Sequence, residues 1–171
     1  MRKRIDVVLG WLLAALMGVA VLNVLWQVFT RWVLRSPSAY TDELARYLLI
    51  WIGLLGAGYA VGRKLHLAID LLPASLSGSR ALVLAVIIDV LVSGFALAVM
   101  VIGGLRLVAL TLLLEQTSAA LRVPLGYVYL ALPLSGALIM FYAGSRIIEH
   151  VNALRAGRRV VPAASAEPPT G

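Results

Sequence analysis

Few residues in this chain are able to do chemistry, and the histidines come first among them. His66 and Asp70 lie four positions apart, so on a helix they share one face. An imidazole beside a carboxylate supplies two zinc ligands, but a zinc site needs at least three from the protein and no third follows nearby. We interpret the pair as a hydrogen-bonded structural pair or a contact with another subunit. The sequence predicts no metal and no cofactor.

Recognisable catalytic motifs are missing from the sequence. It contains no cysteine, which excludes thiolate nucleophiles, thiolate metal sites and disulfides. It contains no HExxH or GxSxG motif, no phosphate-binding P-loop and no glycine-rich dinucleotide turn. Two histidines alone do not make a catalytic constellation, so we predict that the chain is not an enzyme.

Two charged residues, Asp89 and Arg106, interrupt the long apolar run 81–114. On a helix they would lie about 25 Å apart along the axis. Each would then sit near one edge of the hydrocarbon core, and we favour this reading over a buried functional charge. The other apolar runs carry no carboxylate at their centres, where an ion-coupled carrier normally buries one. We therefore expect the chain to transport nothing by itself.

The composition around these residues is that of a membrane protein. Of the 171 residues, 61% are hydrophobic and only 13% are charged, whereas a soluble domain is about half apolar and about a quarter charged. The net charge of +7 lies in short clusters between apolar runs, with no basic face, which argues against a nucleic-acid partner. Four runs reach the ~20 residues that cross a bilayer. The fold class is therefore all-α, an integral membrane four-helix bundle, with spans at about 7–32, 42–63, 81–112 and 124–148.

Two segments outside the spans complete the single membrane domain, 1–154. Residues 65–76 carry a helical apolar stripe but are too short to span, so we expect an interfacial amphipathic segment in the membrane plane. Residues 155–171 are small and polar, and we expect a disordered cytoplasmic tail. Thr41 is the expected N-cap of the second span. Pro133 should kink the fourth.

Small and polar residues inside the spans suit contacts between helices. Gly53 with Ala57, and Gly58 with Gly62, form pairs of small residues four positions apart, which let helix backbones approach closely. We expect most such contacts within the bundle and some with another subunit. Asn23 and Gln27 lie four positions apart in the first span, where hydrogen bonds to a neighbouring helix are expected.

The distribution of arginine and lysine predicts the orientation, since cytoplasmic loops are enriched in these residues. One membrane side would carry ten of them and the other four, with Arg106 inside a span. Both termini and His66 are therefore expected in the cytoplasm. The ten are Arg2, Lys3, Arg4, Arg63, Lys64, Arg80, Arg146, Arg155, Arg158 and Arg159, and the four are Arg31, Arg35, Arg46 and Arg122.

The order of several short motifs resembles the small membrane subunit of TRAP transporters, the tripartite ATP-independent periplasmic transporters of DctQ type. An acidic helix start with Trp and Gly-Ala is followed by a His-x-x-x-Asp, and the third loop and fourth span are also similar. The resemblance covers roughly residues 20–145. Its segments are 27–32 (QVFTRW), 41–57 (TDELARYLLIWIGLLGA), 63–70 (RKLHLAID) and 116–127 (QTSAALRVPLGY), with Tyr129 and Pro133.

The resemblance implies a sodium-coupled secondary uptake system for organic anions of the carboxylate type, in a bacterial or archaeal inner membrane. A periplasmic binding protein captures the solute, a large multi-span subunit carries it, and the small subunit packs against the large one and helps dock the binding protein. The specificity groups would lie on other chains, so the solute stays open. A structural or assembly protein with four spans and no transport role is the alternative.

Charges at the outer end of the second span are the candidate docking residues. The outer loops are short, so few residues can form a platform, and charged rims steer transient partners. The equally weighted alternative is a capped helix end in which Arg46 pairs locally with the preceding acids. The candidate docking residues are Arg31, Arg35, Asp42, Glu43 and Arg46.

Overall fold

The computed structural model describes residues 2–36, 38–63 and 79–155. The predicted interfacial segment 65–76, with His66 and Asp70, lies outside the described residues. So does the predicted tail from residue 156 onward.

The described residues form helices and connecting turns, as an all-α fold requires. Four stretches are long and apolar enough to cross a membrane: Arg4–Trp32, Ala39–Gly62, Arg80–Leu113 and Leu125–Asn152. The predicted all-α bundle of four long apolar helices is thereby confirmed. The elements are α1 (Arg2–Trp32), α2 (Ala39–Gly62), α4 (Ser79–Phe95), the π-helical segment η1 (Ala96–Gly103), α5 (Gly104–Leu113), α6 (Leu125–Tyr129) and α7 (Ala131–Arg155).

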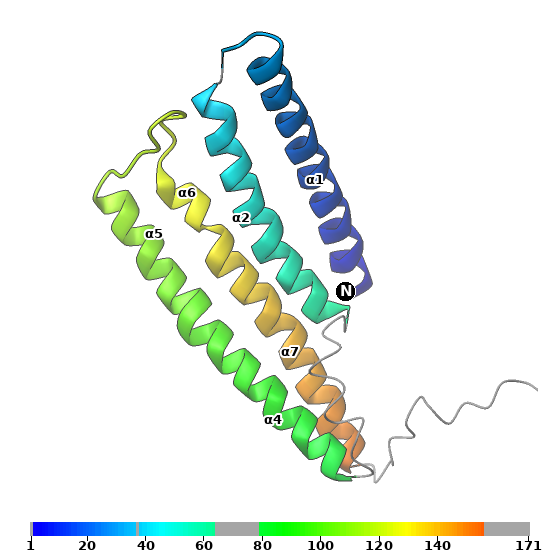
Figure 1. Cartoon of the computed structure of the whole chain (residues 1–171). Helices are drawn as coiled ribbons and strands as arrows, with labels where there is room; N and C mark the ends of the chain where they lie inside the picture. The colour runs from blue at the N-terminus through cyan, green and yellow to red at the C-terminus, as the bar shows by residue number, and fades with distance from the viewer. Residues whose placement is uncertain (1, 37, 64–78, 156–171) are drawn as a thin grey trace, which may run out of the picture.

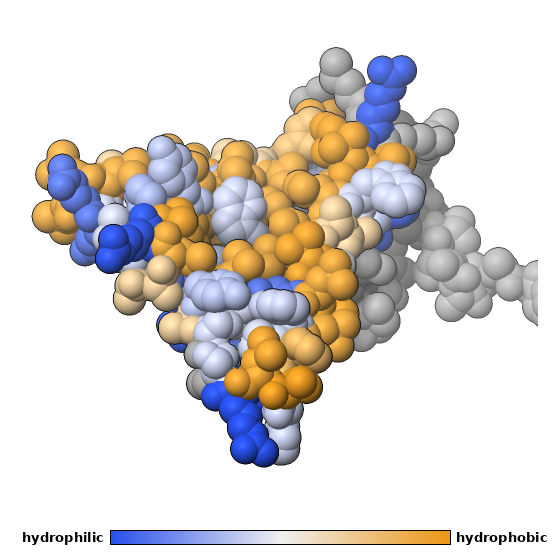
Figure 2. Space-filling model, turned by 90° about the horizontal axis from the view of Figure 1, so that it is seen from above, coloured by the Kyte–Doolittle hydropathy of each residue, from blue (hydrophilic) through white to orange (hydrophobic). Residues whose placement is uncertain are grey.

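The helices lie side by side in the order α1, α2, α6–α7 and α4–η1–α5 (Figure 1). The rod formed by α4, η1 and α5 packs along α7, α7 packs along α2, and α2 packs along α1. We call the end with the connections 33–38 and 114–124 the loop end, and the opposite end, where α1 begins and α7 finishes, the terminal end. Figure 2, viewed from the loop end, shows apolar side chains over much of the outer surface. Those side chains are suited to lipid or to another membrane subunit.

Helix α2 begins earlier than the sequence indicated. The prediction that Thr41 is the N-cap is wrong, because α2 starts at Ala39 and Ser38 occupies the cap position. Thr41 lies in the first turn, fully buried, and its Oγ1 donates to the Ser38 carbonyl at 2.8 Å. The Thr41 carbonyl in turn accepts a hydrogen bond of 2.9 Å from Nδ2 of Asn23 on α1. Thr41 therefore stabilises the first turn of α2 and also connects α2 to α1.

Pro133 acts through the turn before it. A proline has no N–H, so the carbonyl four residues earlier, at Tyr129, loses its helical donor. The helix is interrupted at Leu130, between α6 and α7, and resumes with a bond of 3.2 Å from the Leu134 N–H to the Leu130 carbonyl. Pro133 itself is buried against Gly104 on α5.

The core lies where α7 meets η1 and α2. Its buried members come from three helical rods and are Val61, Ala96, Met100, Ile139 and Tyr142. Gly136 of α7 faces η1 so closely that a Cβ there would meet Met100 Cβ at 2.7 Å and the Ala96 carbonyl oxygen at 3.2 Å. A side chain at position 136 would therefore hold α7 away from the π-helical segment.

Candidate functional site at the loop end

The carboxylate of Glu43 is held by the loop that joins α5 to α6. Its Oε1 accepts the N–H of Ala119 at 3.1 Å, and its Oε2 accepts those of Ala120 at 2.9 Å and Leu121 at 2.8 Å. The Tyr47 hydroxyl, one helical turn further along α2, donates to Oε1 at 3.0 Å. Hydrogen bonds to a carboxylate are among the stronger kinds in proteins. Glu43 therefore fastens α2 to a loop more than 70 positions away in the chain.

The loop presents these N–H groups because it closes on itself at its base. The Leu125 N–H donates to the Gln116 carbonyl at 2.9 Å, and the Ser118 N–H donates to the Val123 carbonyl at 2.9 Å. Glu115 and Arg122 adopt positive φ values of 48° and 52°, which turn the chain sharply on either side. The N–H groups of residues 119–121 at the tip are then directed at Glu43.

Asp42 makes the corresponding connection to the other neighbour of α2. Its Oδ1 accepts a hydrogen bond from Nε2 of Gln27 on α1. The prediction that Asn23 and Gln27 bond to a neighbouring helix is confirmed. Arg46 forms no ion pair with Asp42 or Glu43 in the described part of the chain, so the local pairing considered from the sequence is not formed. The two acids connect α2 to α1 and to the loop instead.

The three arginines of the predicted docking set remain exposed at the loop end. Arg31 lies in the last turn of α1, Arg35 in the connection to α2 with a φ of 50°, and Arg46 on α2. The structure thus divides the predicted set into two acids with partners and three exposed cations.

The predicted packing residues of α2 also divide into two groups. A Cβ at Gly58 would meet Leu138 Cβ at 3.3 Å, and one at Gly62 would meet the Tyr142 ring at 2.6 Å, so both glycines face α7. Gly53 has no atom within 4 Å of such a Cβ, and Ala57 is exposed. These two face away from the described residues of this chain.

An ion pair near the terminal end was not expected from the sequence. Asp89 of α4 is only 5% exposed, and its Oδ1 lies 2.7 Å from Nη2 of Arg146 on α7. Nη1 of Arg146 donates to the Val61 carbonyl of α2 at 3.1 Å, and Nδ1 of His150 lies 3.4 Å from the other Asp89 oxygen. The sequence suggested a charge near one edge of the hydrocarbon core and gave no partner for it; the structure shows Asp89 buried between helices and paired with Arg146. An acid inside an apolar run was the available signal, since such residues usually find a partner.

Comparison with known proteins decides the family. Residues 20–153 match the family described as tripartite ATP-independent periplasmic transporters, DctQ component. The chain belongs to the DctQ family. Its members are transporter subunits and not enzymes. The matched region contains the Glu43 contacts, the buried ion pair, the last three spans and the second part of the first.

The chain is also similar to three individual TRAP transporter proteins. The chain is 40% identical over 93 residues to a sialic acid TRAP transporter small permease protein, SiaQ, of Vibrio cholerae, covering 52% of this chain and 50% of that protein. It is 30% identical over 104 residues to an isethionate TRAP transporter permease protein, DctMQ, of Oleidesulfovibrio alaskensis, covering 61% of this chain and 16% of that protein. It is 35% identical over 63 residues to a sialic acid TRAP transporter permease protein, SiaT, of Haemophilus influenzae, covering 37% of this chain and 10% of that protein. The chain thus spans half the length of the Vibrio relative and much less of the other two.

Proposed function

We propose that this chain is the small permease subunit of a sodium-coupled, binding-protein-dependent uptake system for organic anions of the carboxylate type. The family match across residues 20–153 carries this proposal. Two of the three relatives are named for sialic acid, a carboxylate, which supports this class, and the third is named for isethionate, a sulfonate, which is also an organic anion. In this role the chain packs in the inner membrane against a large transport subunit, with both termini in the cytoplasm.

The apolar outer faces of the helices support a large membrane partner. Along α1 most large apolar side chains are exposed, and α7 is the most enclosed of the four spans. The small residues Gly53 and Ala57 form a shallow strip on the surface of α2 that faces away from α7. Helices of a second subunit pack closely on such small residues.

The loop end is the docking surface for the periplasmic binding protein in this proposal. Arg31, Arg35 and Arg46 supply exposed positive charge, which would steer an acidic patch of the binding protein. Asp42 and Glu43 contribute by holding α1, α2 and the 114–124 loop in one arrangement. Both carboxylates accept hydrogen bonds from this chain, so the charge that steers the binding protein comes from the arginines.

Charge reversal at Arg46 tests the docking role. In proteoliposomes that contain both membrane subunits, Arg46→Glu should raise the binding-protein concentration for half-maximal uptake of the transported solute by about tenfold. Uptake at saturating binding protein should be nearly unchanged. Arg4→Glu, an equally exposed arginine at the opposite end, is the matched control. Equal effects of the two substitutions would contradict the docking role. A separate result, purification of this chain from its native membrane without any larger multi-span protein, would favour the structural alternative.

A further inference from the structure

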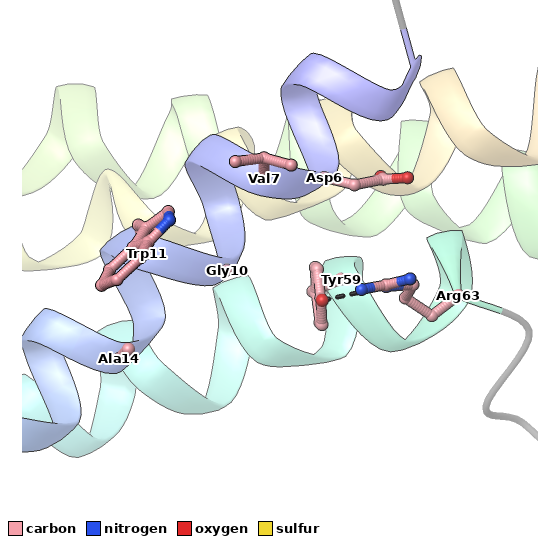
Figure 3. Close-up of a pocket in the computed structure, with 7 residues that line it drawn as sticks. All are labelled: Asp6, Val7, Gly10, Trp11, Ala14, Tyr59 and Arg63. Atoms are coloured by element: carbon pink, nitrogen blue, oxygen red, sulfur yellow. Dashed lines mark hydrogen bonds between the residues drawn. The ribbon is translucent and has the colours of Figure 1, made fainter.

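A hollow of about 340 Å³ lies between α1 and α2 near the terminal end. It is separate from the loop end and from the buried ion pair. Its lining combines apolar side chains with two opposite charges, as Figure 3 shows. The lining residues are Asp6, Val7, Gly10, Trp11, Ala14, Tyr59 and Arg63.

The charged residues lie on facing helices at one end of the hollow (Figure 3). Arg63 directly follows the last residue of α2, and its Nε donates to the Tyr59 hydroxyl at 2.9 Å. The guanidinium carbon also lies 5.4 Å from the centre of the Tyr59 ring. These contacts fix the guanidinium, and the hydrogen bond to Tyr59 raises the pKa of Arg63. Within the described part of the chain, the two terminal nitrogens of Arg63 donate no hydrogen bond, so the described residues leave their four N–H groups without an acceptor.

The carboxylate of Asp6, the opposite charge, is also held in place by a hydrogen bond. Oδ1 of Asp6 accepts the hydroxyl of Tyr142 on α7 at 2.5 Å, which fixes the carboxylate at the rim of the hollow. Among the described residues, none donates to Oδ2. The rim therefore presents a fixed cation and a fixed anion side by side, and neither charge neutralises the other through a direct ion pair in the described residues.

The apolar part of the hollow continues away from the charges, toward the membrane interior. Trp11 and Ala14 lie about one and two helical turns beyond Asp6 along α1. Trp11 is 75% exposed, and exposed tryptophans near the ends of membrane helices commonly contact the lipid headgroups. Gly10 leaves the space beside the Tyr59 ring open, since a Cβ there would lie 3.6 Å from the hydroxyl. An acyl chain fits this apolar strip.

We infer that the hollow binds one zwitterionic phospholipid whose headgroup carries an ammonium group. Arg63 takes the phosphate, because a guanidinium offers paired donors to phosphate oxygens. Asp6 takes the ammonium, and the first acyl carbons lie along Trp11 and Ala14. Phosphatidylglycerol carries neutral hydroxyls in place of the ammonium, so it has no positive charge to pair with Asp6, and a trimethylated headgroup has no N–H to donate to it.

Lipid titration of the purified full-length chain, followed by native mass spectrometry, tests this inference. The probes are dioleoyl phosphatidylethanolamine, phosphatidylcholine and phosphatidylglycerol. The native chain should bind the ethanolamine lipid about tenfold more tightly than the other two, as one charge-assisted hydrogen bond predicts. Equal affinity for phosphatidylglycerol, or no preference over phosphatidylcholine, would overturn the inference.

Four variants assign the binding to this hollow. Arg63→Gln should weaken all three lipids about tenfold, since it removes the phosphate contact. Asp6→Asn should abolish the preference for ethanolamine over choline. Gly10→Leu should block every lipid while leaving both charges in place. Arg4→Gln, an exposed arginine outside the lining, should change nothing. A loss in Arg4→Gln equal to that in Arg63→Gln, or full binding in Gly10→Leu, would overturn the assignment.

Tyr142→Phe separates recognition from folding at Asp6. It removes the hydroxyl that bonds to Asp6 but keeps the carboxylate. The ethanolamine preference should therefore persist in Tyr142→Phe and disappear in Asp6→Asn. Equal loss in both variants would show that Asp6 acts through the packing of α1 on α7, which would overturn the headgroup contact.

Discussion

Nη2 of Arg146 lies 2.7 Å from Oδ1 of Asp89, where α7 meets α4, and the same guanidinium donates to the Val61 carbonyl of α2. One side chain thereby connects three of the four helical rods. Asp89 is 5% exposed, so little water reaches the pair. A charge left without its partner in such surroundings is strongly unfavourable.

Removal of one partner should therefore destabilise the chain more than removal of both. Asp89→Ala leaves the Arg146 guanidinium buried without its anion, and should lower the free energy of unfolding by about 3–5 kcal/mol. The double variant Asp89→Ala with Arg146→Met should recover a large part of this loss. Thermal unfolding of the purified chain in detergent measures both effects.

An exposed acid provides the control for the ion pair. Glu115→Ala removes a carboxylate at the loop end and should change the unfolding temperature little. A single Asp89→Ala variant as stable as the native chain would show that Asp89 is solvated.

The Glu43 contacts predict a local effect on hydrogen exchange. Glu43→Gln replaces one acceptor oxygen by an amide nitrogen that faces N–H donors of the loop. The N–H groups of residues 119–121 should exchange about tenfold faster, since the loss of charged hydrogen bonds costs about 1–3 kcal/mol. Asp42→Asn is the matched control, because Asp42 bonds to α1 and should leave this exchange unchanged. Similar exchange rates in both variants would mean that the loop is held by its own bonds alone.

Two glycine substitutions should differ in their effect on the stability of the isolated chain. Gly136→Ala places a methyl group 2.7 Å from Met100 Cβ, and should lower the free energy of unfolding by about 1–3 kcal/mol. Gly53→Ala meets no atom within 4 Å, so the better helix propensity of alanine should leave stability equal or raise it by about 0.5–1 kcal/mol. Unfolding of both variants in the same detergent gives the comparison. Destabilisation by Gly53→Ala would require a contact that the described residues do not make.

Local sequence patterns predicted the spans and missed the long-range pairs, for a physical reason. About 20 apolar residues between charges are sufficient to define a span, and the polar Asn23 inside one must find a partner nearby. The partner of Glu43 is a row of backbone N–H groups, which no residue type reveals. Asp89 and Arg146 are separated by the end of α4, by η1, α5, a loop and α6, and by the first part of α7, so their pairing depends on how the rods align.

The glycines of α2 show that sequence patterns also fail to predict which face of a single helix meets its neighbour. Gly53 and Gly58 have similar surroundings in the sequence, and their spacing cannot say which of them faces α7. In the structure Gly58 meets Leu138 and Ser135, whereas Gly53 meets nothing within 4 Å. The difference is set by the position of α7 beside α2, which is a tertiary property.

The chain should give no transport when it is the only protein in the membrane. No acid is found at the centres of α1, α2 or α7, and the buried Asp89 is already paired with Arg146. Proteoliposomes containing the purified chain alone should accumulate neither sialic acid nor isethionate under a sodium gradient. Addition of the large subunit and the binding protein is the positive control. Uptake by the lone chain would contradict the proposed division of labour between the subunits.

The orientation of the chain can be tested without background, because it contains no cysteine. Ser36→Cys places a thiol in the exposed connection between α1 and α2, and Asn152→Cys places one at the exposed end of α7. The uneven distribution of arginine and lysine puts the first outside and the second in the cytoplasm. A membrane-impermeant maleimide added to intact spheroplasts should therefore label position 36 and spare position 152. Lysis before labelling should expose both thiols equally, which controls for reactivity. Labelling of position 152 alone in intact spheroplasts would reverse the topology and would place the exposed arginines of the loop end on the cytoplasmic side, where a periplasmic protein could not dock.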